Sequence, residues 1–196
     1  MVLVKHMEGV LHSWEDFDHE RSSAMKRKFI PLDEVLSFLD IKENNRILEI
    51  GAGNGEYAEQ FARIASKGLV VAMEFTENGS RLIFDRIANS GLKNMEMWKA
   101  NACKKEDFSG FDKIFMSNVF HDIKCSDQIL ERFRATIERD AMIFFIEFKK
   151  DPEIGGPPLE FRLSEKELQS IMESHGFSLA KSHDFKYHYM QAYSLV

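Results

Sequence analysis

Compact apolar runs alternate with segments of helical periodicity along most of the chain. Each run of four to eight apolar residues that stops at glycine or polar residues predicts a strand. The predicted strands cover 46–50, 69–73, 95–98, 111–116 and 141–148. Apolar residues at helical spacing predict helices over about 55–65, 77–89 and 128–137, and a shorter one that ends near Ile41. Strands that alternate with helices indicate an open α/β sheet with helices on both faces.

The end of the chain follows a different pattern. Ser164 and Glu167 form a capping-box pattern that starts the last predicted helix, and Gly176 is suited to end it. Two further strands, 177–182 and 187–195, follow without a helix between them. Because parallel strands need a long crossover, we expect these two strands to pair as an antiparallel hairpin.

A ligand of such a sheet is expected beyond the carboxyl ends of its strands, where the strand order reverses. The loops after Ile50, Met73, Ala100 and Met116 lie at this edge of the predicted sheet. The first of them belongs to the sequence ILEIGAGNGEYA, which reads as a strand, a tight turn and a helix. Its alternating glycines allow a ligand to approach the backbone closely, although a plain connecting turn is the simpler alternative.

Two cofactor classes compete for this loop. In the dinucleotide pattern G-x-G-x-x-G the third glycine would fall on Glu56. A pyrophosphate at the start of the helix would also be opposed by Glu49 and Glu56. S-adenosylmethionine has a sulfonium and an ammonium and no phosphate, so carboxylates suit it. Glu74, at the end of the second strand, is placed to accept hydrogen bonds from ribose hydroxyls, a role found with either cofactor; the alternative is a solvated charge.

Four segments, ILEIGAGNG, VVAMEFT, KANA and FDKIFMSNVFHDI, resemble in order the successive motifs of class I S-adenosylmethionine-dependent methyltransferases. The chain is most similar to the small-molecule enzymes related to ubiquinone and menaquinone methyltransferases, the type 11 group, over about residues 45–196. The resemblance implies a Rossmann-like, seven-stranded, mostly parallel sheet with helices on both faces and an antiparallel C-terminal hairpin. Residues 1–44 would form an N-terminal helical segment and 45–196 the methyltransferase domain, within a single globular unit.

The resemblance also implies the residues that contact the cofactor. The methionine part would be held by Glu49, Gly51, Ala52, Gly53 and Gly55, the ribose by Glu74, the adenine by Phe75, Asn101 and Ala102, and the region of the reactive methyl by Ser117 and Asn118. Asn101 replaces the aspartate that is common in the family, and its amide oxygen can still accept a hydrogen bond from the exocyclic amine of adenine.

The implied activity is transfer of a methyl group from the sulfonium to a small-molecule acceptor by in-line displacement. This reaction needs no metal, and alignment can supply much of the catalysis. His121 and Asp122 follow the fourth strand and are the candidate catalytic residues, with His121 as a proton acceptor; a structural pair at a helix entry is the alternative. His188 could face the same cavity or be a half-exposed strand residue.

The composition and charge of the chain restrict the classes of partner that it is expected to bind. The net charge of −6 and the pI near 5.7 argue against a broad basic surface that would bind nucleic acid. SNVFHD also differs from the Asn/Asp-Pro-Pro-aromatic signature of enzymes that methylate exocyclic amines of bases. The longest apolar stretch, 141–146, is far shorter than the roughly 20 residues of a membrane helix. Two cysteines, Cys103 and Cys125, are expected to be free thiols in a reducing, cytoplasmic setting.

The N-terminal segment HSWEDFDHERSSAMKRKF combines aromatic residues with a basic cluster. In the resembling enzymes such segments often fold over cofactor and substrate, so the segment is a candidate lid; an amphipathic helix at the sheet edge is the alternative. A methyltransferase-like protein that binds S-adenosylmethionine but acts through a partner is the alternative function. The sequence leaves open the acceptor, its nucleophilic atom and the oligomeric state.

Overall fold

The computed structural model describes residues 4–5, 10–11 and 14–196, with side chains from residue 15 onward. Its strands are β1 Val4–Lys5, β2 Val10–Leu11, β3 Arg46–Ile50, β4 Leu69–Glu74, β5 Met95–Lys99, β6 Lys113–Ser117, β7 Met142–Phe148, β8 Phe177–Asp184 and β9 His188–Leu195. Its helices are η1 Trp14–Asp16, α1 His19–Phe29, α2 Leu32–Leu39, α3 Glu56–Ile64, α4 Glu77–Ser90, η2 Ala102–Lys104, η3 Phe120–Asp122, α5 Ser126–Thr136, η4 Leu159–Phe161 and α6 Glu165–Ser174.

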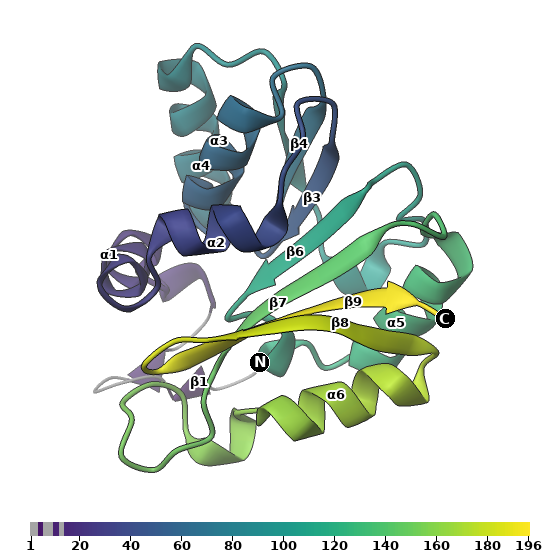
Figure 1. Cartoon of the computed structure of the whole chain (residues 1–196). Coiled ribbons are helices and arrows are strands. Elements are labelled where there is room, and N and C mark those ends of the chain that lie inside the picture. Colours follow the sequence, from purple (N-terminus) through teal and green to yellow (C-terminus); the bar gives the residue numbers. More distant parts are fainter. Residues whose placement is uncertain (1–3, 6–9, 12–13) are drawn as a thin grey trace.

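The seven-stranded sheet has the order β5-β4-β3-β6-β7-β9-β8 (Figure 1). Strands β3 to β7 are parallel, and β9 runs antiparallel to both β7 and β8. The expected α/β fold and its C-terminal hairpin are therefore confirmed. The order reverses between β3 and β6, because the chain builds outward from β3 to β5 and then returns to the other side of β3.

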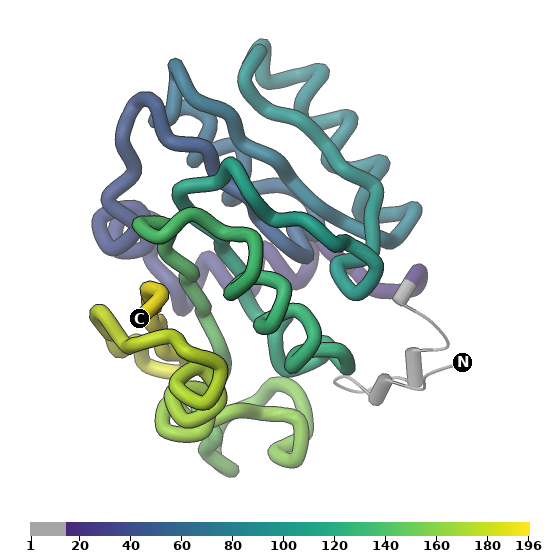
Figure 2. Tube along the Cα trace, turned by 90° about the vertical axis from the view of Figure 1, so that its right-hand side faces the viewer, coloured from purple at the N-terminus to yellow at the C-terminus, as the bar shows by residue number. Residues whose placement is uncertain are grey.

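Apolar residues at alternate positions of the strands contribute to two hydrophobic cores, one on each face of the sheet. In β3, Ile47 belongs to one core, and Leu48 and Ile50 belong to the other. Helices α2, α3 and α4 cover the first face, whereas α5 and α6 cover the second (Figure 1). The view turned by 90° shows the C-terminal hairpin at the end of the sheet away from β4 and α4 (Figure 2).

The boundaries of the last helix follow the expected chemistry. Ser164 accepts a hydrogen bond from the backbone of Glu167, and the Glu167 carboxylate accepts one from the backbone of Ser164. Gly176, with φ of 84°, follows the helix in the left-handed conformation that favours glycine. Within the described residues, no helix combines the length and the apolar character that crossing a membrane requires.

Candidate active site

The carboxyl ends of β3, β4 and β6 meet at one edge of the sheet. Ile50 is in register with Met73 on one side and with Met116 on the other. The loops that follow these strands therefore lie together, as the sequence predicts, and they bring the glycine loop, Glu74 and the segment 117–122 to one place.

The glycine loop is held against both neighbouring strands. The backbone amides of Gly51 and Ala52 donate to the carbonyl of Met73, at 2.9 and 3.0 Å. Gly51, Gly53 and Gly55 all have positive φ, of 69°, 60° and 72°. A Cβ atom at Gly51 would lie 2.5 Å from Cγ2 of Val119, so the loop after β6 packs directly on this glycine.

Glu74 is a centre of hydrogen bonds and not the solvated charge that the sequence left as an alternative. Its side chain is 4% exposed. One carboxylate oxygen accepts from the amide of Gly53 at 3.0 Å, and the other accepts from the amides of Phe75 and Thr76 and from the Thr76 hydroxyl, at 2.9, 3.0 and 3.0 Å. Oε2 accepts from Gly53 alone among the described residues and so retains capacity for a ligand hydroxyl.

Glu49 is buried at 2% exposure, and its Oε2 atom has no hydrogen-bond partner in the described part of the chain. Burial raises the pKa of this carboxyl to about 8, and the positive charge of Lys26 partly opposes the rise. A buried carboxylate with a free oxygen is unfavourable without a cation. The site therefore favours a positively charged ligand group at this position.

One polar atom directly after β6, Oδ1 of Asn118, is also buried without a partner in the described residues. Ser117, the last residue of β6, is buried as well. Asn118 adopts a φ of 55°, rare outside glycine, and its Nδ2 lies 3.4 Å from Nε2 of His188. His188 is 2% exposed, so the half-exposed alternative for this residue is wrong. Burial lowers the pKa of His188 to about 3, which keeps its ring neutral.

His121 is bound to a carboxylate that the sequence analysis did not identify. Its Nδ1 lies 2.5 Å from Oε2 of Glu147, and its Nε2 lies 3.2 Å from Oδ2 of Asp122. Although burial lowers the pKa of His121, the carboxylates outweigh burial and raise it to about 10. The ring is then protonated near neutral pH. A protonated imidazole has no lone pair to accept a proton, so this ion pair favours a positioning role of His121 over the expected proton acceptor.

Glu147 could have been found from the sequence. It is the only charged residue within the predicted apolar strand MIFFIEF, and such a residue requires a partner when buried. In the structure it is 1% exposed, and its Oε1 accepts from the amide of Phe120 at 2.9 Å. Glu147 thus fixes both the backbone and the histidine of the loop after β6.

The N-terminal segment covers the glycine loop. Nε2 of His19 lies 3.2 Å from the Thr76 hydroxyl, and the Ser23 hydroxyl donates to Oδ1 of Asn54 at 2.9 Å. A Cβ atom at Gly53 would lie 3.1 Å from Nδ1 of His19. Residues 1–3, 6–9 and 12–13 of the expected 1–44 segment lie outside the described residues, as does the side chain of Trp14.

The residues expected at the adenine lie on a more open part of the site. Phe75 is 46% exposed, and Asn101 is exposed. The side chain of Asn101 accepts from the amide of Cys103 at 2.9 Å and so begins η2, which also contains Ala102. The expected methionine side is therefore enclosed, whereas the expected adenine side offers an aromatic surface to a flat ring.

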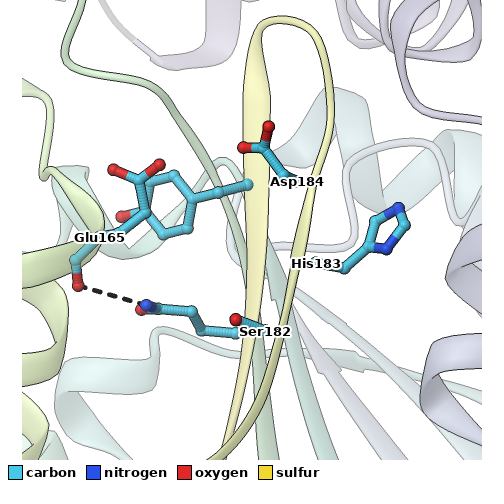
Figure 3. A pocket seen from close by; sticks show the side chains of 6 residues that line it. Glu165, Ser182, His183 and Asp184 are labelled. Carbon is cyan, nitrogen blue, oxygen red and sulfur yellow. Dashed lines mark hydrogen bonds between the residues drawn. The ribbon is translucent and has the colours of Figure 1, made fainter.

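A separate pocket of about 280 Å³ lies between the start of α6 and the C-terminal hairpin (Figure 3). His183 points away from the other labelled residues, and its Nε2 pairs with Glu34 at 2.7 Å. The side-chain amide of Gln191 donates a hydrogen bond to the backbone carbonyl of Glu165, at 3.3 Å. Because these polar groups do not converge, this pocket is not the candidate active site.

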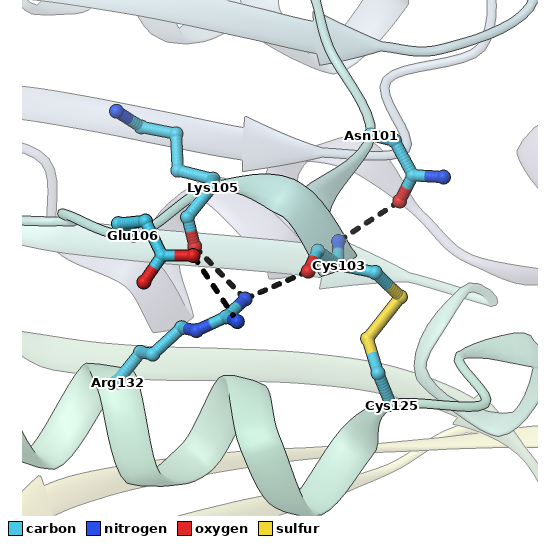
Figure 4. Close-up of a disulfide and its surroundings, with 6 residues drawn as sticks. All are labelled: Asn101, Cys103, Lys105, Glu106, Cys125 and Arg132. Atoms are coloured by element: carbon cyan, nitrogen blue, oxygen red, sulfur yellow. Dashed lines mark hydrogen bonds and ion pairs between the residues drawn. A yellow bond between two sulfur atoms is a disulfide. The ribbon is translucent and has the colours of Figure 1, made fainter.

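The expectation of two free thiols is wrong. Cys103 and Cys125 form a disulfide with a Cα–Cα distance of 5.8 Å (Figure 4). It joins η2, after β5, to the residue before α5, so it links two loops of the ligand edge. Arg132 supports the same contact by donating to the carbonyl of Cys103 at 2.7 Å. The scarcity of cysteines suggested a reducing compartment, and this disulfide counts against that interpretation.

Known proteins share both the sequence family and the fold. The family model described as a methyltransferase domain matches residues 41–190, so the chain belongs to this methyltransferase family. The chain is 32% identical over 119 residues to a probable ribosomal RNA small subunit methyltransferase A of Methanosphaera stadtmanae, a match that covers 61% of this chain and 42% of that protein. The chain thus spans less than half of this curated relative.

Solved structures give the same class. The crystal structure of a SAM-dependent methyltransferase from Aquifex aeolicus matches with a TM-score of 0.82 and 26% identity, covering 92% of this chain and 100% of that chain. The O-methyltransferase NcsB1 of neocarzinostatin biosynthesis, solved with S-adenosyl-L-homocysteine and 1,4-dihydroxy-2-naphthoic acid, matches with a TM-score of 0.76 and 14% identity, covering 91% and 57%. The latter likeness concerns the fold alone.

The chain therefore belongs to the methyltransferase family and shares its fold with a SAM-dependent enzyme, so S-adenosylmethionine is the cofactor to compare with the site. The residues of the site fit this molecule. Glu49 presents a buried, unpartnered carboxylate oxygen to a cationic group, and Glu74 has remaining acceptor capacity for ribose hydroxyls. The missing side chains at Gly51 and Gly53 let Val119 and His19 pack closely on the backbone of this turn.

Proposed function

We propose that this protein methylates a small-molecule acceptor by in-line displacement. The observation that carries the proposal is a pair of buried polar atoms without a partner in the described residues, Oε2 of Glu49 and Oδ1 of Asn118, at the ligand edge of the sheet. Such an enclosed site suits a small molecule better than a large polymer. The bound sulfonium supplies the methyl group, and the chain contributes alignment and exclusion of water.

The proposal gives the protein residues separate tasks. Glu49 and the glycine loop hold the methionine part, Glu74 holds the ribose, and Phe75, Asn101 and Ala102 receive the adenine. Ser117 and Asn118 line the region of the transferred methyl. His121 and Asp122 act by positioning: the ion pair of His121 with Glu147 fixes the loop that carries them. The N-terminal segment, 1–44, serves as the lid that excludes water, and 45–196 as the methyltransferase domain.

Nucleic acid is the second candidate acceptor, because the curated relative is named as a probable ribosomal RNA methyltransferase. Two observations favour the small molecule. The net charge of −6 opposes association with phosphates, and the segment SNVFHD lacks the proline-containing signature of base-amine methylation. The acceptor is therefore assigned to the small-molecule class, with RNA as the comparison in the test.

Calorimetric titration followed by a labelled-methyl screen tests this function. S-adenosylmethionine and S-adenosylhomocysteine are expected to bind and raise the melting temperature, whereas NAD and NADP are not. The screen uses quinone precursors, phenols and amines beside ribosomal RNA. Label transferred to a small molecule supports the proposal. Transfer to RNA alone would overturn the acceptor class, and NAD binding without S-adenosylmethionine binding would overturn the cofactor.

A further inference from the structure

One face of α1 lies against the glycine loop. His19, Ser23 and Lys26 recur at intervals of four and three residues, so they share a side of the helix. His19 and Ser23 are buried, and Ser23 donates to Oδ1 of Asn54 at 2.9 Å. The same side therefore directs Lys26 to the site, whereas Lys28 is exposed on another side of the helix.

The Lys26 ammonium lies among carboxylates that it does not contact. Its Nζ is 5.7 Å from the centre of the Tyr57 ring, in the first turn of α3. Burial lowers the pKa of Lys26, and Glu49, then Glu56 and Glu74, act in the opposite direction. Within the described residues, no carboxylate oxygen lies within the 4.0 Å of an ion pair with Lys26.

Glu49 and Lys26 thus influence each other's ionisation without forming an ion pair. Oε2 of Glu49 has no partner among the described residues, and Lys26 is the cation that acts most on its carboxylate. The neighbouring Arg27 is already paired with Glu56. A bound group that carries both signs could make a direct charge-assisted contact with each of the two residues.

The amino-acid end of S-adenosylmethionine is such a group, because one carbon bears both its ammonium and its carboxylate. With the ammonium at Glu49, the carboxylate needs a cation on the other side. When the amino-acid end of the cofactor binds between Glu49 and Lys26, their distant attraction is replaced by two direct charge-assisted contacts, one to each residue. Lys26 is the charged side chain that α1 places there.

We propose that Lys26 binds the carboxylate of the methionine part of S-adenosylmethionine and so ties α1 to the bound cofactor. This inference rests on the proposed function of the same site. It adds a contact from outside the glycine loop and assigns a ligand-binding task to the N-terminal segment.

Decarboxylated S-adenosylmethionine, which keeps the ammonium and sulfonium, isolates the contact. Calorimetry measures the dissociation constants of both compounds for the parent, Lys26→Met, Lys26→Arg and the control Lys28→Met. We expect Lys26→Met to weaken S-adenosylmethionine binding by about 10- to 100-fold and to leave the decarboxylated compound unchanged or more tightly bound. Lys26→Arg keeps most of the parent's preference for the carboxylate, and Lys28→Met leaves both constants unchanged.

Two outcomes would overturn the inference. An equal loss for both compounds means that Lys26 only supports the position of α1. Tighter binding of S-adenosylmethionine by Lys26→Met means that Lys26 competes with the ligand ammonium. A parent that binds neither compound refutes the proposed function itself, which is a separate failure. Circular dichroism verifies the fold of each variant, and Lys26→Gln serves as a second neutral replacement.

Discussion

Nδ1 of His121 lies 2.5 Å from Oε2 of Glu147, with both side chains almost fully buried. The folded-state pKa of His121, about 10, lies above its ordinary value of 6.5. The folded protein therefore binds the proton of His121 more tightly than the unfolded chain does. The resulting stabilisation of the fold is fully present below about pH 6.5 and is lost as the pH rises through about 10. The free-energy advantage of the parent over His121→Gln is expected to shrink over this range.

Urea unfolding at several pH values measures this advantage. An advantage that instead grew with pH would mean that His121 is neutral in the folded state. The methyl-transfer rate supplies an independent readout. A neutral base would lose activity as the pH falls through about 6.5, whereas the protonated, positioning His121 gives no such loss.

Replacing Glu49 by Gln is expected to stabilise the ligand-free protein and weaken cofactor binding. The pKa of Glu49 is raised to about 8, so its ionisation opposes folding increasingly as the pH rises from about 4.5 to about 8. The melting temperature of Glu49→Gln should exceed that of the parent more at pH 8 than at pH 5. The lost charged contact should weaken S-adenosylmethionine by about 1.5–3 kcal/mol. Unchanged affinity would remove Glu49 from the cofactor site.

Glu74→Ala is expected to lower both stability and cofactor affinity. From the sequence, a strand-end acid should contribute little to stability. The structure corrects this expectation, because the carboxylate accepts from Gly53, Phe75 and Thr76. Leaving such buried donors unpaired costs about 1–3 kcal/mol. Chemical unfolding and calorimetry measure the two effects, with the exposed Glu96→Ala as control. Full affinity in a folded Glu74→Ala protein would refute its ribose role.

Gly51→Ala is expected to destabilise the fold more than Gly110→Ala. Both glycines have positive φ, 69° and 77°, so both substitutions strain the backbone by about 1–2 kcal/mol. Only the new methyl at Gly51 meets a neighbour, because Val119 Cγ2 would lie 2.5 Å away and Gly110 has nothing within 4 Å. Thermal unfolding compares the two, and Val119→Ala should recover part of the Gly51→Ala loss. Equal losses of thermal stability in the two variants would show that backbone strain alone causes the destabilisation.

The sheet could be predicted from the sequence because its strands are short apolar runs separated by turns. The strand at 46–50 agrees with β3, and the run at 141–148 agrees closely with β7, Met142–Phe148. The capping pattern at Ser164 also placed the start of α6, since both halves of the box are local. These signals depend on residues that are near one another in the chain.

Contacts between distant segments could not be predicted in the same way. Cys103 and Cys125 are 22 positions apart, and only the neighbouring loops of the ligand edge reveal that they meet. The pairing of His121 with Glu147 similarly requires that β6 and β7 be neighbours. The sequence thus identified His121 as a candidate, but its protonation depends on a partner supplied by another strand.

Strand β9 is inserted between β7 and β8 although it follows both in the chain. During synthesis from the N-terminus, a nascent chain that has not yet released residues 188–195 leaves an edge of the apolar strand β7 unpaired. Such an edge is open to pairing with other chains. His188, which approaches Asn118, also arrives with this last strand. Strand β9 therefore both covers this edge of β7 and brings His188 to Asn118.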